Sequence, residues 1–183
     1  VLRNPGADWE PYALEMLAGV LDGNDSARLN RALVREQRVA NSAGAGYDST
    51  ARGPGTFYLD GTPSEGKTVT DLEVALRSEV EKLVRDGVTE EELARVKAQV
   101  VAGHVFQLDS MFFQAMQIGQ LESIGLSYRD VETMLKKLQA VTAEQVRDVA
   151  KKYLKDESLT IAVLDPQPLE QKAPTPAPAG LRH

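Results

Sequence analysis

The sequence predicts an α+β domain in which an antiparallel sheet carries helices packed on one face. Three observations lead to this prediction: helix starts with threonine caps, helices with a single apolar face, and short segments with the composition of strands. A helix that is apolar on one side needs a surface to cover that side, and a sheet provides one. We therefore expect about six helices stacked against a small sheet.

The helix starts carry capping boxes, in which a threonine hydroxyl accepts a hydrogen bond from the third backbone N–H and an acid or amide reaches back to the cap. The pairs are Thr70 with Glu73, Thr89 with Glu92 and Thr142 with Gln145. Between these starts, apolar residues recur at helical spacing, which predicts one buried face per helix. The clearest series are Trp9, Ala13, Met16, Leu17, Val20 and Leu21, then Leu72, Leu76, Val80 and Leu83, and finally Val146, Val149, Ala150, Tyr153 and Leu154.

Three segments have the composition of strands: residues 39–47, 56–60 and 159–164. The first consists mostly of small residues, the second alternates apolar and polar residues, and the third is apolar and β-branched. The first two are separated by a turn-rich segment and predict a hairpin. Any further strand is expected upstream of Val1, because a chain that begins with valine indicates a longer polypeptide.

Residues 1–166 are expected to form one domain, since a chain of this length suffices for a single core. The composition changes after Asp165, where proline and alanine become frequent. Such a composition favours an extended chain without a core, so residues 167–183 are predicted to be a disordered tail.

The formal net charge is −6, and the chain has no cysteine. Basic side chains alternate with acids and form no stripe with aromatic residues, which argues against nucleic acid and against an anionic membrane as partners. The longest apolar run, residues 159–164, is too short to span a membrane. Without cysteine the chain has no disulfide, thiolate nucleophile or thiolate metal site, and both redox compartments stay open.

The side chains that most enzymes use for catalysis are scarce. The only histidines are His104, on a predicted helix, and His183, in the predicted tail. A catalytic zinc normally has about three protein ligands, which these two residues do not supply, and a lone helical histidine is more often packed or solvent-facing. The same scarcity argues against a serine triad. We predict no catalytic residue, no metal ligand and no cofactor in this chain.

Two other clusters have structural explanations. Glu90, Glu91 and Glu92 follow the cap residue Thr89, where carboxylates complement the positive end of the helix dipole. The segment 111-MFFQAM-116 has the composition of a ligand-binding surface, but its helical spacing predicts core.

Three segments in a fixed order carry a family resemblance: 17-LAGVLDGNDSARLNRALVREQRVANSAGAGY-47, 57-FYLDGTP-63 and 85-RDGVTEEELARVKAQVV-101. Together they resemble the C-terminal, non-zinc half of the pitrilysin/insulinase family of zinc metallopeptidases, and most closely the bacterial branch related to mitochondrial processing peptidase. The resemblance covers residues 9–166. It implies that this chain is one of two homologous halves. Each half is a sheet covered by helices, and the two halves close together over a peptide.

In that family the N-terminal half binds zinc through H-x-x-E-H and a further glutamate, and this chain lacks the motif. The implied function is that of a non-catalytic C-terminal domain of a zinc-dependent endopeptidase, which closes over extended peptide substrate and helps to bind it. The implied partners are the peptide and an N-terminal zinc-bearing domain or partner subunit, which would hold the zinc. Exported bacterial relatives imply a periplasmic location.

Two alternatives stay open. The chain is an inactive structural or binding subunit that scaffolds or partners a separate zinc-bearing chain, or it is an independent hydrolase that uses Glu and Asp pairs. A homodimer is compatible with each, because loss of the N-terminal half would expose an apolar face.

The resemblance also implies one substrate-binding residue. Family members grip substrate carbonyls with an arginine and with a tyrosine seven residues later. Aligning the V-R-E segment places the arginine at Arg35, whose guanidinium can donate several hydrogen bonds. The tyrosine position falls on Ser42, and Tyr47, five residues further along the strand, points to the opposite face. Arg35 is therefore the predicted substrate-binding residue, without its usual aromatic companion.

Overall fold

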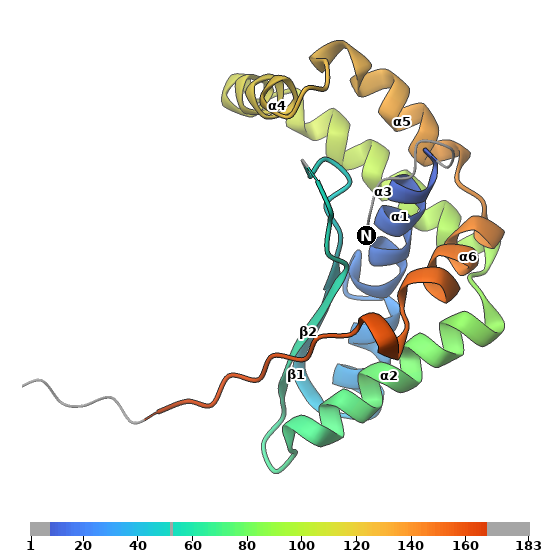
Figure 1. The fold of residues 1–183 in the computed structure, drawn as a ribbon, viewed down its shortest axis with the longest axis vertical. Helices are drawn as coiled ribbons and strands as arrows, with labels where there is room; N and C mark the ends of the chain where they lie inside the picture. The colour runs from blue at the N-terminus through green and yellow to red at the C-terminus, as the bar shows by residue number, and fades with distance from the viewer. Residues whose placement is uncertain (1–7, 52, 168–183) are drawn as a thin grey trace, which may run out of the picture.

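The computed structural model describes residues 8–51 and 53–167 (Figure 1). The predicted tail beyond Gln167, with His183, lies outside the described residues. In chain order the elements are α1 (Glu10–Asp22), η1 (Asn30–Glu36), β1 (Ala40–Gly46), β2 (Tyr58–Pro63), α2 (Val69–Asp86), α3 (Glu90–Gln107), α4 (Met111–Ser123), η2 (Tyr128–Asp130), α5 (Val131–Ala140), α6 (Ala143–Tyr153) and η3 (Asp156–Ser158).

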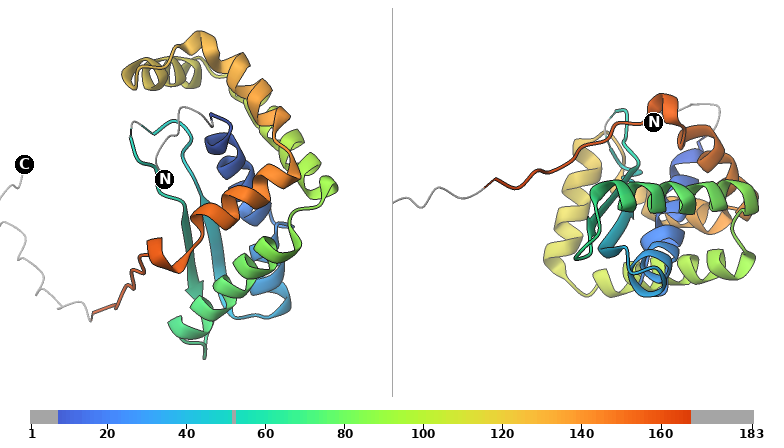
Figure 2. Two further views of the ribbon diagram at one scale, coloured as in Figure 1. Left: turned by 45° about the vertical axis from the view of Figure 1, so that its right-hand side comes forward. Right: turned by 90° about the horizontal axis from the view of Figure 1, so that it is seen from below.

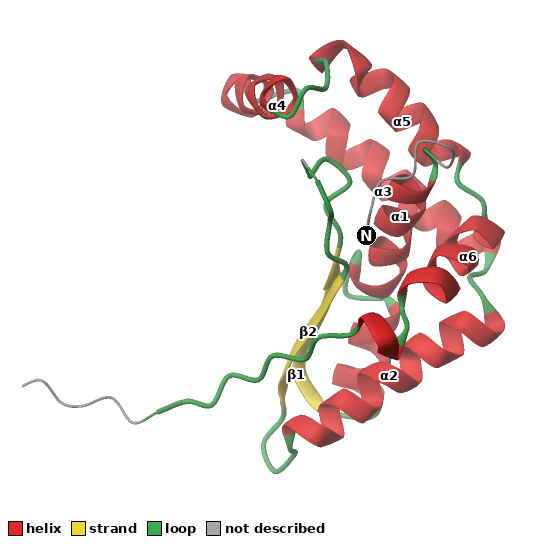
Figure 3. Ribbon diagram, in the orientation of Figure 1, coloured by secondary structure: helices red, strands yellow, loops and turns green. Residues whose placement is uncertain are grey.

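The sheet is an antiparallel hairpin of β1 and β2, with Ala40 opposite Pro63 at one end and Gly46 opposite Tyr58 at the other. Helix α1 packs against β1 and helix α2 against β2. Figures 1 and 3 show the helices gathered on one side of the hairpin, while its opposite face is turned away from them. This arrangement confirms the predicted α+β class with helices on one face of an antiparallel sheet.

Helix α1 lies at the centre of the core and contacts α3, α5, α6 and β1 (Figure 2). Eight of its thirteen residues are buried and only Asp22 is exposed, which is typical of a helix that is covered on most sides. The largest fully buried side chains come from α1, the residues around η1, and helices α2, α3 and α6: Leu14, Met16, Leu17, Leu21, Leu29, Leu33, Leu83, Leu93, Val141, Val146 and Val149.

Close packing of α1 against α3 depends on Gly19. A Cβ atom at this position would lie 2.5 Å from Cγ1 of the buried Val96. Gly19→Ala is therefore expected to lower the free energy of unfolding by about 1 to 3 kcal/mol, measured by urea denaturation. Val96→Ala makes room for the new methyl group. The double variant should therefore lose less free energy of unfolding than the two single variants lose in sum.

A matched control for this substitution is Gly119→Ala in α4, where a Cβ atom would meet nothing within 4 Å. Alanine favours the helix more than glycine does, so this variant should gain up to about 1 kcal/mol. Equal effects of the two substitutions would contradict the close contact between α1 and α3.

Two of the three predicted capping boxes are confirmed. Thr89 pairs with Glu92 and Thr142 with Gln145, each with both reciprocal bonds. The third prediction is wrong: α2 is capped two residues earlier than Thr70, by Thr68 with Asp71. The short Asp71 side chain reaches the Thr68 N–H at 2.8 Å, so aspartate closes the box here as glutamate does elsewhere.

The predicted hairpin is confirmed, with its second strand starting two residues later than expected, at Tyr58. The predicted third strand is wrong, because residues 159–164 follow η3 as an exposed irregular segment. Leu159, Ile161 and Val163 are each about half exposed, at 49%, 51% and 58%. A β-branched composition gives a strand only where a neighbouring strand accepts its hydrogen bonds, and no strand lies beside this segment in the described part of the chain.

The predicted burial of residues 111–116 is also wrong. Met111 and Phe112 are 86% and 79% exposed, and Met116 is 46% exposed. Helix α4 buries only Leu121 fully. Helical spacing predicted which residues share a face, but the helix lies at the edge of the described fold, where that face has little to pack against (Figure 1).

Candidate functional site

Arg35 lies in η1, the short helix that leads into β1. This helix has π geometry, in which the Gln37 N–H donates to the Ala32 carbonyl five residues earlier at 2.9 Å. Such π turns occur frequently at functional sites. The Arg35 side chain is exposed, and no ion pair holds it within the described residues. Its guanidinium is therefore available to an incoming group.

The turn from η1 into β1 is held in an unusual conformation. Arg38 has a φ of 52°, in the left-handed region that a residue other than glycine adopts at some cost. The end of β2 stabilises it: the Ser64 hydroxyl donates to the Arg38 carbonyl at 2.6 Å, and the Ser64 N–H donates to the Val39 carbonyl at 3.0 Å. These bonds fix the direction in which η1 enters the hairpin.

The two residues discussed as companions of Arg35 lie differently. Ser42 is exposed on β1, whereas Tyr47, just beyond the strand, is partly buried and packs against the core. The position seven residues after Arg35 thus offers only a small hydroxyl to a ligand on this surface. The Tyr47 side chain contributes to the packing of the core instead.

Arg28, in the same arginine-rich stretch, has a structural role. Its Nε and Nη2 donate to the two carboxylate oxygens of Glu92 at 2.8 and 2.7 Å, and Nη2 also donates to the Gly87 carbonyl at 2.9 Å. Both side chains are largely buried, with 14% and 17% exposed. This fork ties the segment before η1 to the start of α3, which the dipole interpretation of Glu92 did not anticipate.

Glu92 is consequently more acidic than an ordinary glutamate. Hydrogen bonds from Arg28, followed by those from Thr89, lower the pKa of its carboxyl to about 2 against the opposing effect of burial. The carboxylate therefore stays charged throughout the physiological range.

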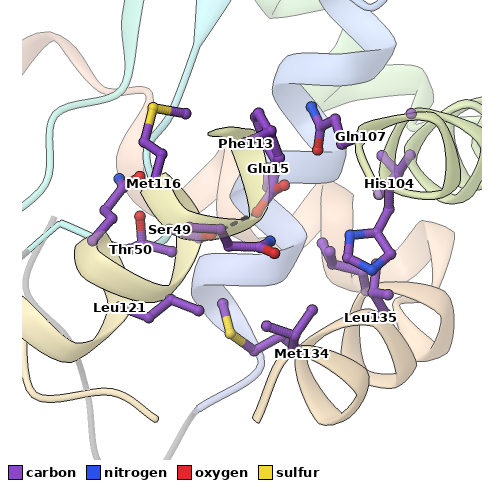
Figure 4. Close-up of a pocket in the computed structure, with 16 residues that line it drawn as sticks. Glu15, Ser49, Thr50, His104, Gln107, Phe113, Met116, Leu121, Met134 and Leu135 are labelled. Carbon is purple, nitrogen blue, oxygen red and sulfur yellow. Dashed lines mark hydrogen bonds between the residues drawn. The ribbon is translucent and has the colours of Figure 1, made fainter. Parts of the chain in front are cut away.

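A cavity with a volume of about 370 Å³ lies between α1, the loop after β1, α3, α4 and α5 (Figure 4). Its wall is largely apolar, with side chains such as Phe113, Met116 and Met134, and His104 also lines it. In Figure 4 the Glu15 side chain points from α1 toward Ser49, and their hydrogen bond is drawn as a dashed line. The Ser49 hydroxyl donates to Glu15 Oε2 at 2.6 Å.

Burial raises the pKa of the Glu15 carboxyl above its ordinary value; the Ser49 hydrogen bond opposes this and the charge of Asp48 adds to it. Sequence reasoning missed this residue. The signal that could have found it is the helix itself, since residues 11–21 contain no charged residue other than Glu15, and a glutamate in such an apolar helix is expected to be at least partly buried. The predicted lone histidine, His104, is half-buried and faces the same cavity.

Glu10, at the start of α1, is the second missed carboxylate, and its role is structural. It is buried and accepts hydrogen bonds from Lys152 Nζ and Tyr153 Oη, each at 2.5 Å. These contacts join α1 to α6 and leave no oxygen of Glu10 open for chemistry.

Within residues 8–51 and 53–167, no group of three or more His, Cys, Asp or Glu side chains is placed to hold a metal ion. Over the same residues, no helix combines the length and the apolarity needed to cross a membrane. His104 and Glu15 thus share a cavity with apolar groups and amides, without a metal-binding set around them.

Residues 2–100 match the family model described as the peptidase M16 inactive domain. Over 175 residues the chain is 28% identical to an uncharacterized zinc protease of Mycobacterium tuberculosis, covering 94% of this chain and 39% of that protein. Over 159 residues it is 29% identical to an uncharacterized zinc protease of Streptomyces coelicolor, covering 84% of this chain and 34% of that protein. The chain therefore spans less than two-fifths of the length of these relatives.

Solved structures share the fold. The inactive peptidase domain of a protein classed as a zinc protease, from Bordetella parapertussis, superposes with a TM-score of 0.75 at 17% identity, covering 92% of this chain and 90% of that one. A protease from Helicobacter pylori gives 0.73 at 19% identity, covering 81% of this chain and 36% of that one. The sequence match, supported by the shared fold, confirms the family resemblance: the chain belongs to the family of peptidase M16 inactive domains.

Proposed function

We propose that this chain is the non-catalytic C-terminal domain of a zinc-dependent endopeptidase, in which it covers extended peptide substrate and helps to bind it. Zinc and the residues that activate water would come from an N-terminal domain or a partner subunit. Membership of the inactive-domain family, together with relatives named zinc proteases that are more than twice as long as this chain, supports this division of labour.

The observation that carries the binding role is the hairpin. The helices lie on one side of it, and each of its two strands has an outer edge with no strand beside it in the described part of the chain. An extended peptide can join such an edge through main-chain hydrogen bonds. The edge of β1 is partly used, because the Ala45 N–H donates to the Asp22 carboxylate at 3.3 Å. The outer edge of β2 is therefore the better place for a peptide to pair as an added strand.

Hydrogen exchange tests this role. An unstructured peptide added to the full-length product of the gene should slow amide exchange in residues 58–62 of β2, because the new strand protects those N–H groups. Amides on the exposed surface of α6, which lines neither the hairpin edge nor the cavity beside α1, serve as the control and should not change. Slower exchange in α6 and β2 alike, or in neither, would contradict binding at this edge.

A further inference from the structure

The cavity beside α1 contains the carboxyl group of Glu15, which forms no ion pair with a lysine or arginine in the described part of the chain. The Ser49 hydroxyl donates to Glu15 Oε2, and among the described residues no donor is bonded to Oε1. Of the residues that the structure describes, no lysine or arginine lines the cavity. A carboxylate in a largely apolar wall gains much from a positively charged partner, because the low local dielectric strengthens their attraction.

The surroundings favour a cation over other ligands. Asp48 lies near enough to Glu15 to add its negative charge, and an anion would therefore be repelled. The other polar groups that line the described wall are hydroxyls, side-chain amides and the imidazole of His104. Apolar contacts come from three sides, with Val100 on α3, Phe113 on α4 and Leu135 on α5.

We propose that this cavity binds an organic cation with an apolar body, its ammonium or guanidinium group against Glu15 Oε1 and its hydrocarbon against α3, α4 and α5. A volume of about 370 Å³ falls within the range of small-molecule sites and suits a ligand such as an arylalkylamine or the side chain of lysine or arginine. This site rests on side-chain chemistry away from the hairpin edge, so it stands independently of the proposed peptidase role.

Titration calorimetry on the 183-residue chain tests the proposal with three probes of similar shape: phenethylamine, phenethyl alcohol and 3-phenylpropionate. The amine should bind at least about tenfold more tightly than the alcohol, because only the amine forms a charge-assisted bond. The carboxylate should bind most weakly. Equal affinity for amine and alcohol would overturn the proposal and leave a merely apolar cavity.

Glu15→Gln separates charge from shape. The amide oxygen still accepts from Ser49, while the negative charge is lost, so amine affinity should fall about tenfold or more and alcohol affinity should stay the same. Glu132→Gln is the matched control, because Glu132 is exposed on α5. An unchanged amine affinity in Glu15→Gln would exclude Glu15 as the partner.

Gly103→Leu closes the cavity without touching Glu15. Gly103 lines the cavity from α3, and a Cβ atom there would meet nothing within 4 Å, so the helix should accept the larger side chain. Amine binding should disappear in this variant. Gly119→Leu, in α4 and outside the cavity, is the control and should bind normally. Normal binding by a folded Gly103→Leu variant would place the amine elsewhere and overturn the proposal.

The source of the cation is decided by a second pair of titrations, with phenethylamine and with an acetylated, amidated Gly-Lys-Gly peptide. Glu15-dependent binding of the peptide assigns the cavity to a basic side chain, and Glu15-dependent binding of the amine alone assigns it to a free small molecule. Failure of both would overturn the proposed site while leaving the peptide-edge experiment on β2 unaffected.

Discussion

Arg28→Ala is expected to lower the free energy of unfolding by about 2 to 3 kcal/mol at pH 7, because it leaves a largely buried carboxylate without its partner. The substitution also frees the Gly87 carbonyl at the junction of α2 and α3. Arg28→Lys keeps the charge but not the fork of donors, so it should recover only part of the loss. Urea denaturation at constant salt measures all three proteins.

The pH dependence gives a sharper version of this prediction. The folded pKa of Glu92 is about 2, below its ordinary value of 4.5, so its contribution to stability is complete above pH 4.5 and is lost as pH falls toward 2. The difference between the natural protein and Arg28→Ala should therefore shrink between pH 5 and pH 2.5. A difference in the free energy of unfolding that stays constant over that interval would show that Arg28 does not stabilise the fold through its bonds to the Glu92 carboxylate.

Arg95→Ala provides the comparison within the same helix. Arg95 pairs with Glu91 at 3.2 Å, and both side chains are mostly exposed. Exposed pairs of this kind contribute less than about 1 kcal/mol, and salt screens them. A loss as large as that of Arg28→Ala would mean that burial does not distinguish the two ion pairs.

On the proposed function, with Arg35 as the substrate-binding residue, Arg35→Ala is expected to lower kcat/KM of the full-length protein about tenfold to a hundredfold, while its zinc content and stability stay unchanged. The reason is the loss of charge-assisted hydrogen bonds to substrate carbonyls, which are worth about 1.5 to 3 kcal/mol. Because Arg35 is exposed and unpaired in the described structure, the fold itself should not depend on it. Cleavage of an unstructured peptide under kcat/KM conditions measures the effect.

Arg31→Ala is the control for Arg35→Ala. Arg31 lies in the same helix and is exposed, with only a loose contact of 3.9 Å to Glu36. Removing it alters the charge of η1 equally but should leave cleavage within about twofold of the natural enzyme. Equal losses in the two variants would assign the effect to general charge and would remove Arg35 from the binding site.

The features that sequence reasoning predicted correctly are local. The boxes at Thr89 and Thr142 involve residues three apart, so their geometry is set before any tertiary contact forms. The start of α2 was misplaced because Thr68 and Thr70 offer equivalent patterns two residues apart, and the sequence alone does not rank them.

The features that it missed depend on distant contacts. Residues 159–164 have strand composition, but a strand requires a neighbour, and composition does not supply one. Residues 111–116 have core composition on a helix with few neighbours. Glu15 and the cavity around it bring together five segments of the chain, which no spacing rule connects.

The central claim is that this chain serves a zinc peptidase without holding the zinc. Its most direct test measures zinc content and cleavage of an unstructured peptide for the 183-residue chain and for the full-length product of the gene. The account predicts zinc and cleavage in the full-length protein and neither in the chain alone. Absence of both from the full-length protein would exclude a zinc-bearing N-terminal domain on the same polypeptide, and their absence also after mixing with a zinc-bearing partner subunit would contradict the claim and favour a scaffold. Cleavage by the chain alone in excess chelator would contradict it outright.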